Sequence, residues 1–114
     1  MGHLIYNSNL TIFFDDRTLA HLQAVIASKL RHKEGFHFTW RDEASAGSGS
    51  RNVIWVYPGV SLVYVYSSSH TPRINPEWIS ALLGSASTPD GLTVLPEPLS
   101  ASAGQHLLAS LREH

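Results

Sequence analysis

Residues 53–57, Val-Ile-Trp-Val-Tyr, and residues 62–66, Leu-Val-Tyr-Val-Tyr, are short runs of β-branched and aromatic residues, which favour β-strands. Each run is apolar on both faces of the strand it would form. The preceding run, residues 36–41, alternates aromatic residues with His37, Thr39 and Arg41 and therefore predicts one wet face. An antiparallel sheet with one face in water normally alternates in this way. The two fully apolar runs thus predict that more chain, another copy or a partner covers the second face.

The loop at Pro58-Gly59 decides which side chains of the two runs share a face, provided that the runs pair. A two- or four-residue loop puts the aromatic residues of both strands together, whereas a three-residue loop puts Ile54 and Val56 on that side instead. We expect the first arrangement, because burial of aromatic side chains contributes more free energy. The opposite face then carries a β-branched strip that is a candidate interface: Ile54, Val56, Val63 and Val65.

The N-terminal third predicts a β-hairpin followed by a helix. Residues 3–6 and 10–14 are the strands, and Asn7-Ser8-Asn9 is the turn, since asparagine tolerates a left-handed backbone. Asp15 or Asp16 caps the helix and Gly35 ends it. Its buried side repeats at helical spacing, which leaves His21 on another face: Leu19, Leu22, Val25, Ile26 and Leu30.

A second helix begins after Asn75, its predicted cap, with Pro76 at the first helical position and Trp78 on its apolar side. Residues 92–95 follow as a short edge strand. The sequence therefore predicts one α+β domain, residues 1–98, in the order β-β-α-β-β-β-α. We expect a small antiparallel sheet with the helices on one face. Residues 99–114 form a tail whose leucines share one side of a short helix and would cover part of the strip: Leu107, Leu108 and Leu111.

Composition excludes several classes of protein. The chain of 114 residues contains no cysteine, which removes disulfides, thiolate metal sites and a cysteine nucleophile. Its net charge of −1, with scattered basic residues, argues against a nucleic-acid binder. No segment is long and apolar enough to span a membrane, and the N-terminus lacks the pattern of a signal peptide. We therefore expect a cytoplasmic protein without a membrane partner.

No catalytic or metal-binding motif stands out. The histidines lack the spacing of a zinc site, so we expect no metal and no cofactor. Ser67–Ser69, His70 and a carboxylate could be imagined as a triad, but no nucleophile-elbow motif is present, and a polar loop is the simpler interpretation. The best candidate for anion binding is the start of the second helix, which is preceded by His70, Thr71 and Arg73.

Four blocks in order resemble a family of small actinobacterial proteins without an established function, over about residues 1–98. They are residues 14–23, 36–42, 54–58 and 74–79. Members of that family are sometimes labelled "ATP-dependent DNA ligase". The resemblance implies this label and no mechanism, and no functional residues carry over. The chain lacks the K-x-D-G motif of a ligase, since neither Lys29 nor Lys33 matches it.

These observations favour a binding or interaction domain without catalysis of its own, which we expect to be a homodimer and which could also bind another protein. The alternative is a nucleic-acid-associated accessory protein, which would give the ligase label some basis. A third alternative is a small enzyme that uses the anion site near His70 and Arg73.

Overall fold

The structure is a computed structural model that describes residues 1–41 and 50–99. The predicted α+β class and the order β-β-α-β-β-β-α are confirmed, with a short final strand. The elements are β1 (Gly2–Tyr6), β2 (Leu10–Phe14), α1 (Asp16–Arg31), β3 (Phe36–Arg41), β4 (Arg51–Val56), β5 (Leu62–Val65), α2 (Pro76–Ala86) and β6 (Leu92–Thr93). The predicted tail helix lies outside the described residues.

The strands form two three-stranded sheets rather than the single sheet expected. One has the order β2-β1-β5 and is antiparallel, and the other has the order β4-β3-β6, in which β6 runs parallel to β3. The expected hairpin between β4 and β5 is therefore wrong. A turn closed by the Val60 N–H and the Tyr57 carbonyl, 3.1 Å apart, carries the chain from one sheet to the other. There β5 pairs with β1, which lies more than 50 residues earlier.

The two strands next to this turn present different residue types to the core. In β4, Val56 is 1% exposed and Ile54 is half-buried, whereas Trp55 is 49% exposed. The aromatic face expected for β4 is thus wrong. In β5 the expectation holds, because Leu62 and Tyr64 pack against the core, whereas Val63 and Val65, which alternate with them, are exposed. The β-branched strip therefore does not exist as one surface.

Helix α1 is amphipathic and supplies the centre of the core. The Asp15 carboxylate caps it by accepting hydrogen bonds from the Thr18 N–H and hydroxyl, at 3.0 and 2.6 Å. The helix ends one turn before Gly35, because Lys33 adopts the left-handed backbone conformation with a φ of 59°. The predicted apolar side is confirmed, although Leu30 is only partly buried: Leu19, Leu22, Val25 and Ile26 are fully buried.

Helix α2 begins as predicted. The Asn75 side chain accepts a hydrogen bond from the Glu77 N–H, and Pro76 takes the first helical position. Trp78 is 4% exposed, and its indole N–H donates to the Leu95 carbonyl at 2.9 Å, which fastens the chain after β6 to the helix. This bond satisfies the only polar group of a buried tryptophan.

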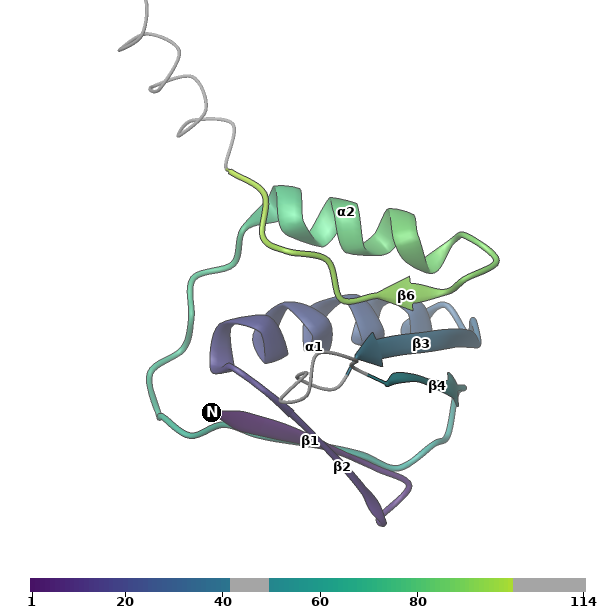
Figure 1. Ribbon diagram of the computed structural model, residues 1–114, viewed down its shortest axis with the longest axis horizontal. Coiled ribbons are helices and arrows are strands. Elements are labelled where there is room, and N and C mark those ends of the chain that lie inside the picture. The colour runs from purple at the N-terminus through teal and green to yellow at the C-terminus, as the bar shows by residue number, and fades with distance from the viewer. Residues whose placement is uncertain (42–49, 100–114) are drawn as a thin grey trace, which may run out of the picture.

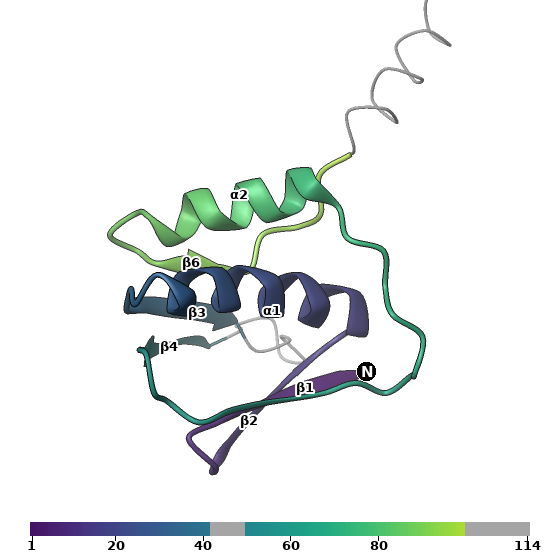
Figure 2. The same ribbon diagram turned by 180° about the vertical axis from the view of Figure 1, so that it is seen from behind.

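In both ribbon views α1 lies between α2 and the β1–β2 hairpin (Figure 1). Figure 2 shows α1 in front of β3, so that this helix covers the inner face of the β4-β3-β6 sheet. A single hydrophobic core joins both sheets to both helices. The Tyr6 hydroxyl also donates to the Trp55 carbonyl at 2.6 Å and links the end of β1 directly to β4.

Candidate functional site

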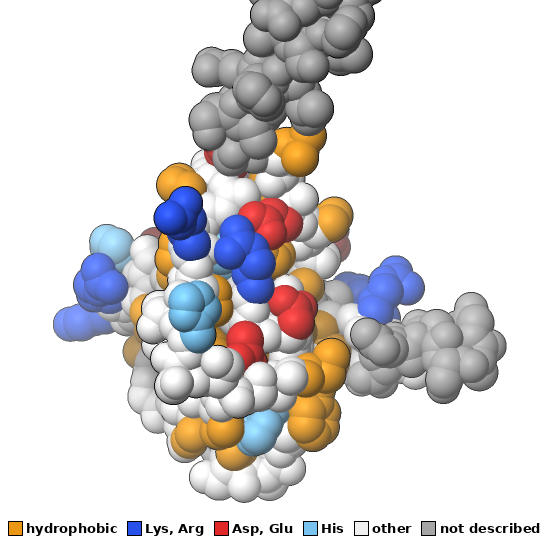
Figure 3. Space-filling view, turned by 90° about the vertical axis from the view of Figure 1, so that its left-hand side faces the viewer, with side chains coloured by type: hydrophobic (Ala, Val, Ile, Leu, Met, Phe, Trp, Pro, Cys, Tyr) orange, Lys and Arg blue, Asp and Glu red, His pale blue; other side chains and the backbone are white. Residues whose placement is uncertain are grey.

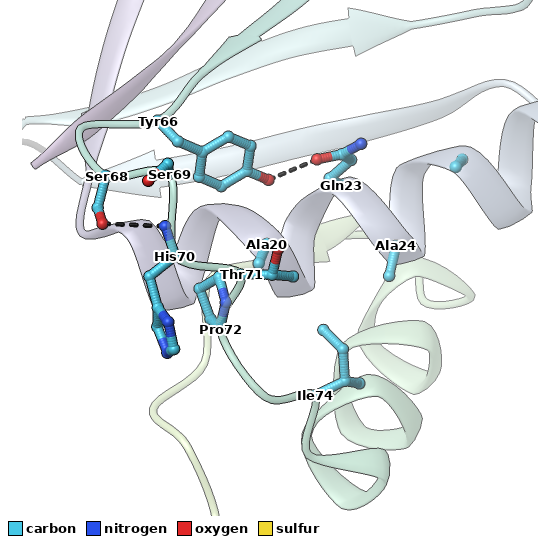
Figure 4. Close-up of a pocket in the computed structure, with 11 residues that line it drawn as sticks. Ala20, Gln23, Ala24, Tyr66, Ser68, Ser69, His70, Thr71, Pro72 and Ile74 are labelled. Atoms are coloured by element: carbon cyan, nitrogen blue, oxygen red, sulfur yellow. Dashed lines mark hydrogen bonds between the residues drawn. The ribbon is translucent and has the colours of Figure 1, made fainter.

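A groove of about 460 Å³ runs along the exposed side of α1 and is closed on one side by the segment that follows β5. Its size lies in the range of small-ligand and peptide sites. Figure 4 shows Ala20 and Ala24 of α1 facing Thr71 and Ile74 across it. No lysine, arginine, aspartate or glutamate lines the groove, which is formed by Ala20, Gln23, Ala24, Ala27, Tyr66, Ser68, Ser69, His70, Thr71, Pro72 and Ile74.

One wall of the groove is fixed by a hydrogen bond from the Tyr66 hydroxyl to Oε1 of Gln23 (Figure 4). Burial, and then the negative charge of Asp16, raise the pKa of Tyr66, so the phenol remains a neutral donor. Because Oε1 of Gln23 accepts this bond, the amide NH₂ of Gln23 keeps its two N–H donors. Sequence patterns gave no sign of the groove, apart from the small residues at positions 20, 24 and 27.

The loop that follows Tyr66 is anchored to the first turn of α1. The Asp16 carboxylate accepts hydrogen bonds from the Ser67 N–H, the Ser67 hydroxyl and the Ser68 N–H, at 3.1, 2.9 and 3.1 Å. These bonds, the one from the Ser67 N–H foremost, hold the pKa of Asp16 below its usual value. This carboxylate therefore holds the groove wall in position.

The same contacts test whether the serines, His70 and a carboxylate of this loop are arranged as a catalytic triad. The carboxylate of Asp16 bonds directly to Ser67, and the Ser68 hydroxyl accepts a bond from the backbone N–H of His70 at 3.1 Å. A triad needs a histidine ring nitrogen between serine and carboxylate. Among residues 1–41 and 50–99, no such ring contact joins these groups, so the loop has a structural role.

The three residues proposed for an anion site do not all line the groove. His70 and Thr71 line the groove, whereas Arg73 is absent from its lining. The helix N-terminus is occupied instead by Asn75, whose amide N–H group donates to the Glu97 carboxylate at 2.9 Å. An anion placed there would meet the negative charge of Glu97, so the arrangement lends the anion site no support.

Glu97 is the centre of a charged cluster that sequence reasoning missed. Arg17 binds its carboxylate through two hydrogen bonds of 2.7 and 2.6 Å and also donates to the Arg73 carbonyl. Bonds from Arg17, and then from Asn75, lower the pKa of Glu97 to about 2. Figure 3 shows one face of the molecule, where acidic and basic side chains lie next to one another rather than in a patch of one sign.

His21 is buried, and its expected place on another face of α1 is wrong. Its ring is 0% exposed and lies 4.4 Å from the Trp78 ring, centre to centre. Nε2 accepts a hydrogen bond from the Asn75 N–H at 2.8 Å, and Nδ1 lies 2.7 Å from the Arg17 carbonyl. These two partners place the proton on Nδ1 and satisfy both nitrogens, so His21 joins the two helices.

The residues expected at an interface are divided. Ile54 and Val56 face the core, whereas Val63 and Val65 are 47% and 37% exposed on the outer face of β5. Leu107, Leu108 and Leu111 lie outside the described residues. Sequence reasoning missed Phe13, which is 63% exposed on the same sheet as the two valines.

Three further findings concern the described part of the chain. No group of three or more histidine, aspartate or glutamate side chains there could hold a metal ion. No helix there is long and apolar enough to cross a membrane. A second hollow, of about 750 Å³, lies between β2 and the end of β3 and supports no assignment.

The fold and the groove define a small α+β domain whose described residues assemble no catalytic constellation. The chain belongs to the family DUF7882, a domain of unknown function, whose model matches residues 1–97. No curated protein and no solved structure matches the chain.

Proposed function

We propose that this domain is a non-catalytic interaction module that self-associates through the outer face of the β2-β1-β5 sheet. The observation that carries the proposal is an exposed apolar surface on three neighbouring strands. The surface consists of His3, Ile5, Thr11, Phe13, Val63 and Val65, and we call it the outer face below.

The register of the strands arranges these six residues in two rows. His3 lies between Phe13 and Val65 in the first row. Ile5 lies between Thr11 and Val63 in the second. The His3 and Phe13 rings are in contact, with centroids 5.5 Å apart. A contiguous apolar patch of this kind on a soluble domain is typical of a protein-interaction surface.

A second copy is the occupant that fits the outer face best. The face contains no lysine, arginine, aspartate or glutamate, so a charged partner would lose hydration without finding a complement. Two copies facing each other across a two-fold axis would bury the same uncharged surface on both sides. The central strand β1 then lies near the axis, in the manner of two sheets packed face to face.

The size of the outer face sets the expected affinity of the dimer. Three strands of four or five residues, spaced by about 4.8 Å, cover roughly 14 by 17 Å. This is less than the ~800 Å² that each partner buries in a standard stable interface. We therefore expect a reversible dimer that depends on concentration.

Sedimentation velocity over a concentration series tests the proposal with two matched variants. Val63→Glu places a charge on the outer face, and Val53→Glu places the same charge on the outer side of the other sheet, at a residue of similar exposure (47% and 45%). The wild type and Val53→Glu should dimerise, and Val63→Glu should remain a folded monomer. The proposal would be overturned if the wild type is monomeric at the highest concentration, or if both variants lose dimerisation to the same extent.

The nucleic-acid alternative is favoured by one observation on the other sheet. Trp55 is 49% exposed and touches the His37 ring, and Arg41 and Arg51 lie opposite each other at the end of the same face. Exposed aromatic rings beside arginines suit single strands. Two phosphate contacts predict a slope of only about −1.4 in log K against log salt. Quenching of Trp55 fluorescence by an oligonucleotide, reduced by salt and absent in Arg41→Ala/Arg51→Ala, would support this alternative.

A further inference from the structure

The groove along α1 has an apolar floor with a polar rim and no charged lining. The methyl groups of Ala20, Ala24 and Ala27 form the floor, and Ile74 closes its end. The rim carries the Gln23 amide and the hydroxyls of neighbouring serine and threonine residues. Small side chains on a helix allow another backbone to approach closely, so this surface suits a peptide segment with branched apolar side chains.

We propose that the groove is the docking site of the chain's own C-terminal segment, residues 100–114, with Leu107 and Leu111 seated on the alanine floor. These two leucines are four residues apart, which places them on one side of a helix. They are thus spaced like Ala20 and Ala24, over which they would lie.

The position where the described chain ends supports this occupant. The Pro98 carbonyl accepts a hydrogen bond from the Asn75 side chain, and the neighbouring Ile74 lines the groove. The nine residues from Pro98 to Leu107 span about 13 Å as a helix and about 30 Å when extended. The groove floor begins one helical turn beyond Arg17, which is fastened to Glu97. The segment is therefore long enough to reach the floor.

The charge pattern supports the same occupant. Residues 100–111 contain no lysine, arginine, aspartate or glutamate, and Arg112 is the first charged residue after Glu97. A segment without charges enters an uncharged groove without an ion-desolvation penalty. Attachment to the same chain also gives the segment an effective concentration in the millimolar range. Weak contacts are then sufficient for docking.

The absence of cysteine from the chain allows a direct test in the full-length protein. A nitroxide attached to Ser110→Cys should broaden the backbone amide signals of Ala20, Ala24 and Ala27 in an NMR spectrum. The same label in a Leu107→Asp/Leu111→Asp background is the matched control and should leave these signals sharp. Ala24→Glu, a change on the groove floor, should also displace the labelled segment from the groove, so that the broadening is lost. The core signals of Leu4 and Leu22 should stay dispersed.

The remaining outcomes distinguish the chain's own C-terminal segment from other occupants of the groove. Absence of broadening in Ser110→Cys would overturn the proposal. Broadening in a mixture of labelled and isotope-enriched copies would assign the groove to the tail of a second copy and would also overturn it. The measurement is repeated with Val63→Glu, because the proposed docking does not need the dimer. Broadening that persists in Val63→Glu would show that docking of the C-terminal segment does not depend on dimerisation through the outer face.

Discussion

The backbone N–H of Asn75 donates a hydrogen bond of 2.8 Å to Nε2 of His21, and both groups are buried. The bond connects the middle of α1 to the cap of α2 across 54 residues of sequence. It satisfies one of the N–H groups that a helix N-terminus leaves unpaired. The buried histidine is therefore a structural link between the helices.

We expect His21→Ala to destabilise the fold by about 2–4 kcal/mol, because it leaves a cavity beside Trp78 and deprives the Asn75 N–H of its acceptor. His32→Ala is the matched control. The His32 ring bonds to the carbonyl four residues earlier, as the His21 ring does, but it is exposed. Its loss should cost less than about 0.5 kcal/mol in urea unfolding. Similar losses of stability in the two variants would contradict the role of His21 as a buried link between the helices.

Ser8→Gly should stabilise the β1–β2 hairpin by up to about 1 kcal/mol. Asn7 and Ser8 both have positive φ, 53° and 66°, which is the geometry of a type I′ turn. Glycine adopts this conformation without the strain that a serine side chain causes. Asn9→Gly, one position later and without positive φ, should not stabilise the protein. Thermal unfolding of the three proteins measures the difference, and a stabilised Asn9→Gly alone would contradict the turn type.

The stability of the fold should fall between pH 4.5 and 2 through Glu97. The pKa of this carboxyl is lowered to about 2, from a usual value of 4.5 that applies to the unfolded chain. Its contribution is therefore complete above pH 4.5 and is lost as the pH falls through 2. Glu97→Gln should unfold more easily than the wild type at pH 7, and the difference should shrink towards pH 2.

Glu34→Gln is the control for this pH dependence. It removes the same charge from a single exposed ion pair with Lys29, which is 3.0 Å long, and exposed pairs contribute little. Its effect at pH 7 should be smaller than that of Glu97→Gln. A constant difference between wild type and Glu97→Gln across the acid range would show that the charge of Glu97 is not the cause.

Incubation with ATP and magnesium should leave the chain without an AMP adduct. Nucleotidyl transfer needs a nucleophilic lysine beside the phosphates, whereas the Lys29 ammonium group is bonded to the Glu34 carboxylate, whose negative charge repels phosphate. Intact mass spectrometry measures the result. A gain of one AMP, mapped to Lys29 or Lys33, would contradict the expectation.

Local sequence predicted the elements well because their signals lie within a few residues. Asp15 and Asn75 cap the helices through bonds to N–H groups two or three residues later. The leucines of α1 lie on the predicted side because helical periodicity depends on the backbone alone. The end of α1 was predicted less accurately, because Lys33, rather than Gly35, adopts the left-handed conformation that follows the helix.

The candidate site could not be predicted in the same way. The groove forms between α1 and a segment that is about 45 residues later in the chain, and the Arg17–Glu97 pair joins residues 80 apart. His21 gave no sign of burial, because a histidine at this spacing suits a wet face equally well. Nδ1 bonds to a carbonyl of α1 itself, but the partner of Nε2 is the Asn75 N–H, which only the packing of α2 brings within reach.

The sequence by itself determined the α+β class, the element order, the cap of α2 and the presence of strands with two apolar faces, and it narrowed the cap of α1 to Asp15 or Asp16. The tertiary structure decided how those strands pair. Adjacent strands pair when a tight turn aligns them, but β5 finds β1 instead of β4, since pairing depends on long-range packing more than on local preference. That pairing leaves Val63 exposed on the outer face, and the segment that follows β5 then closes one side of the groove along α1.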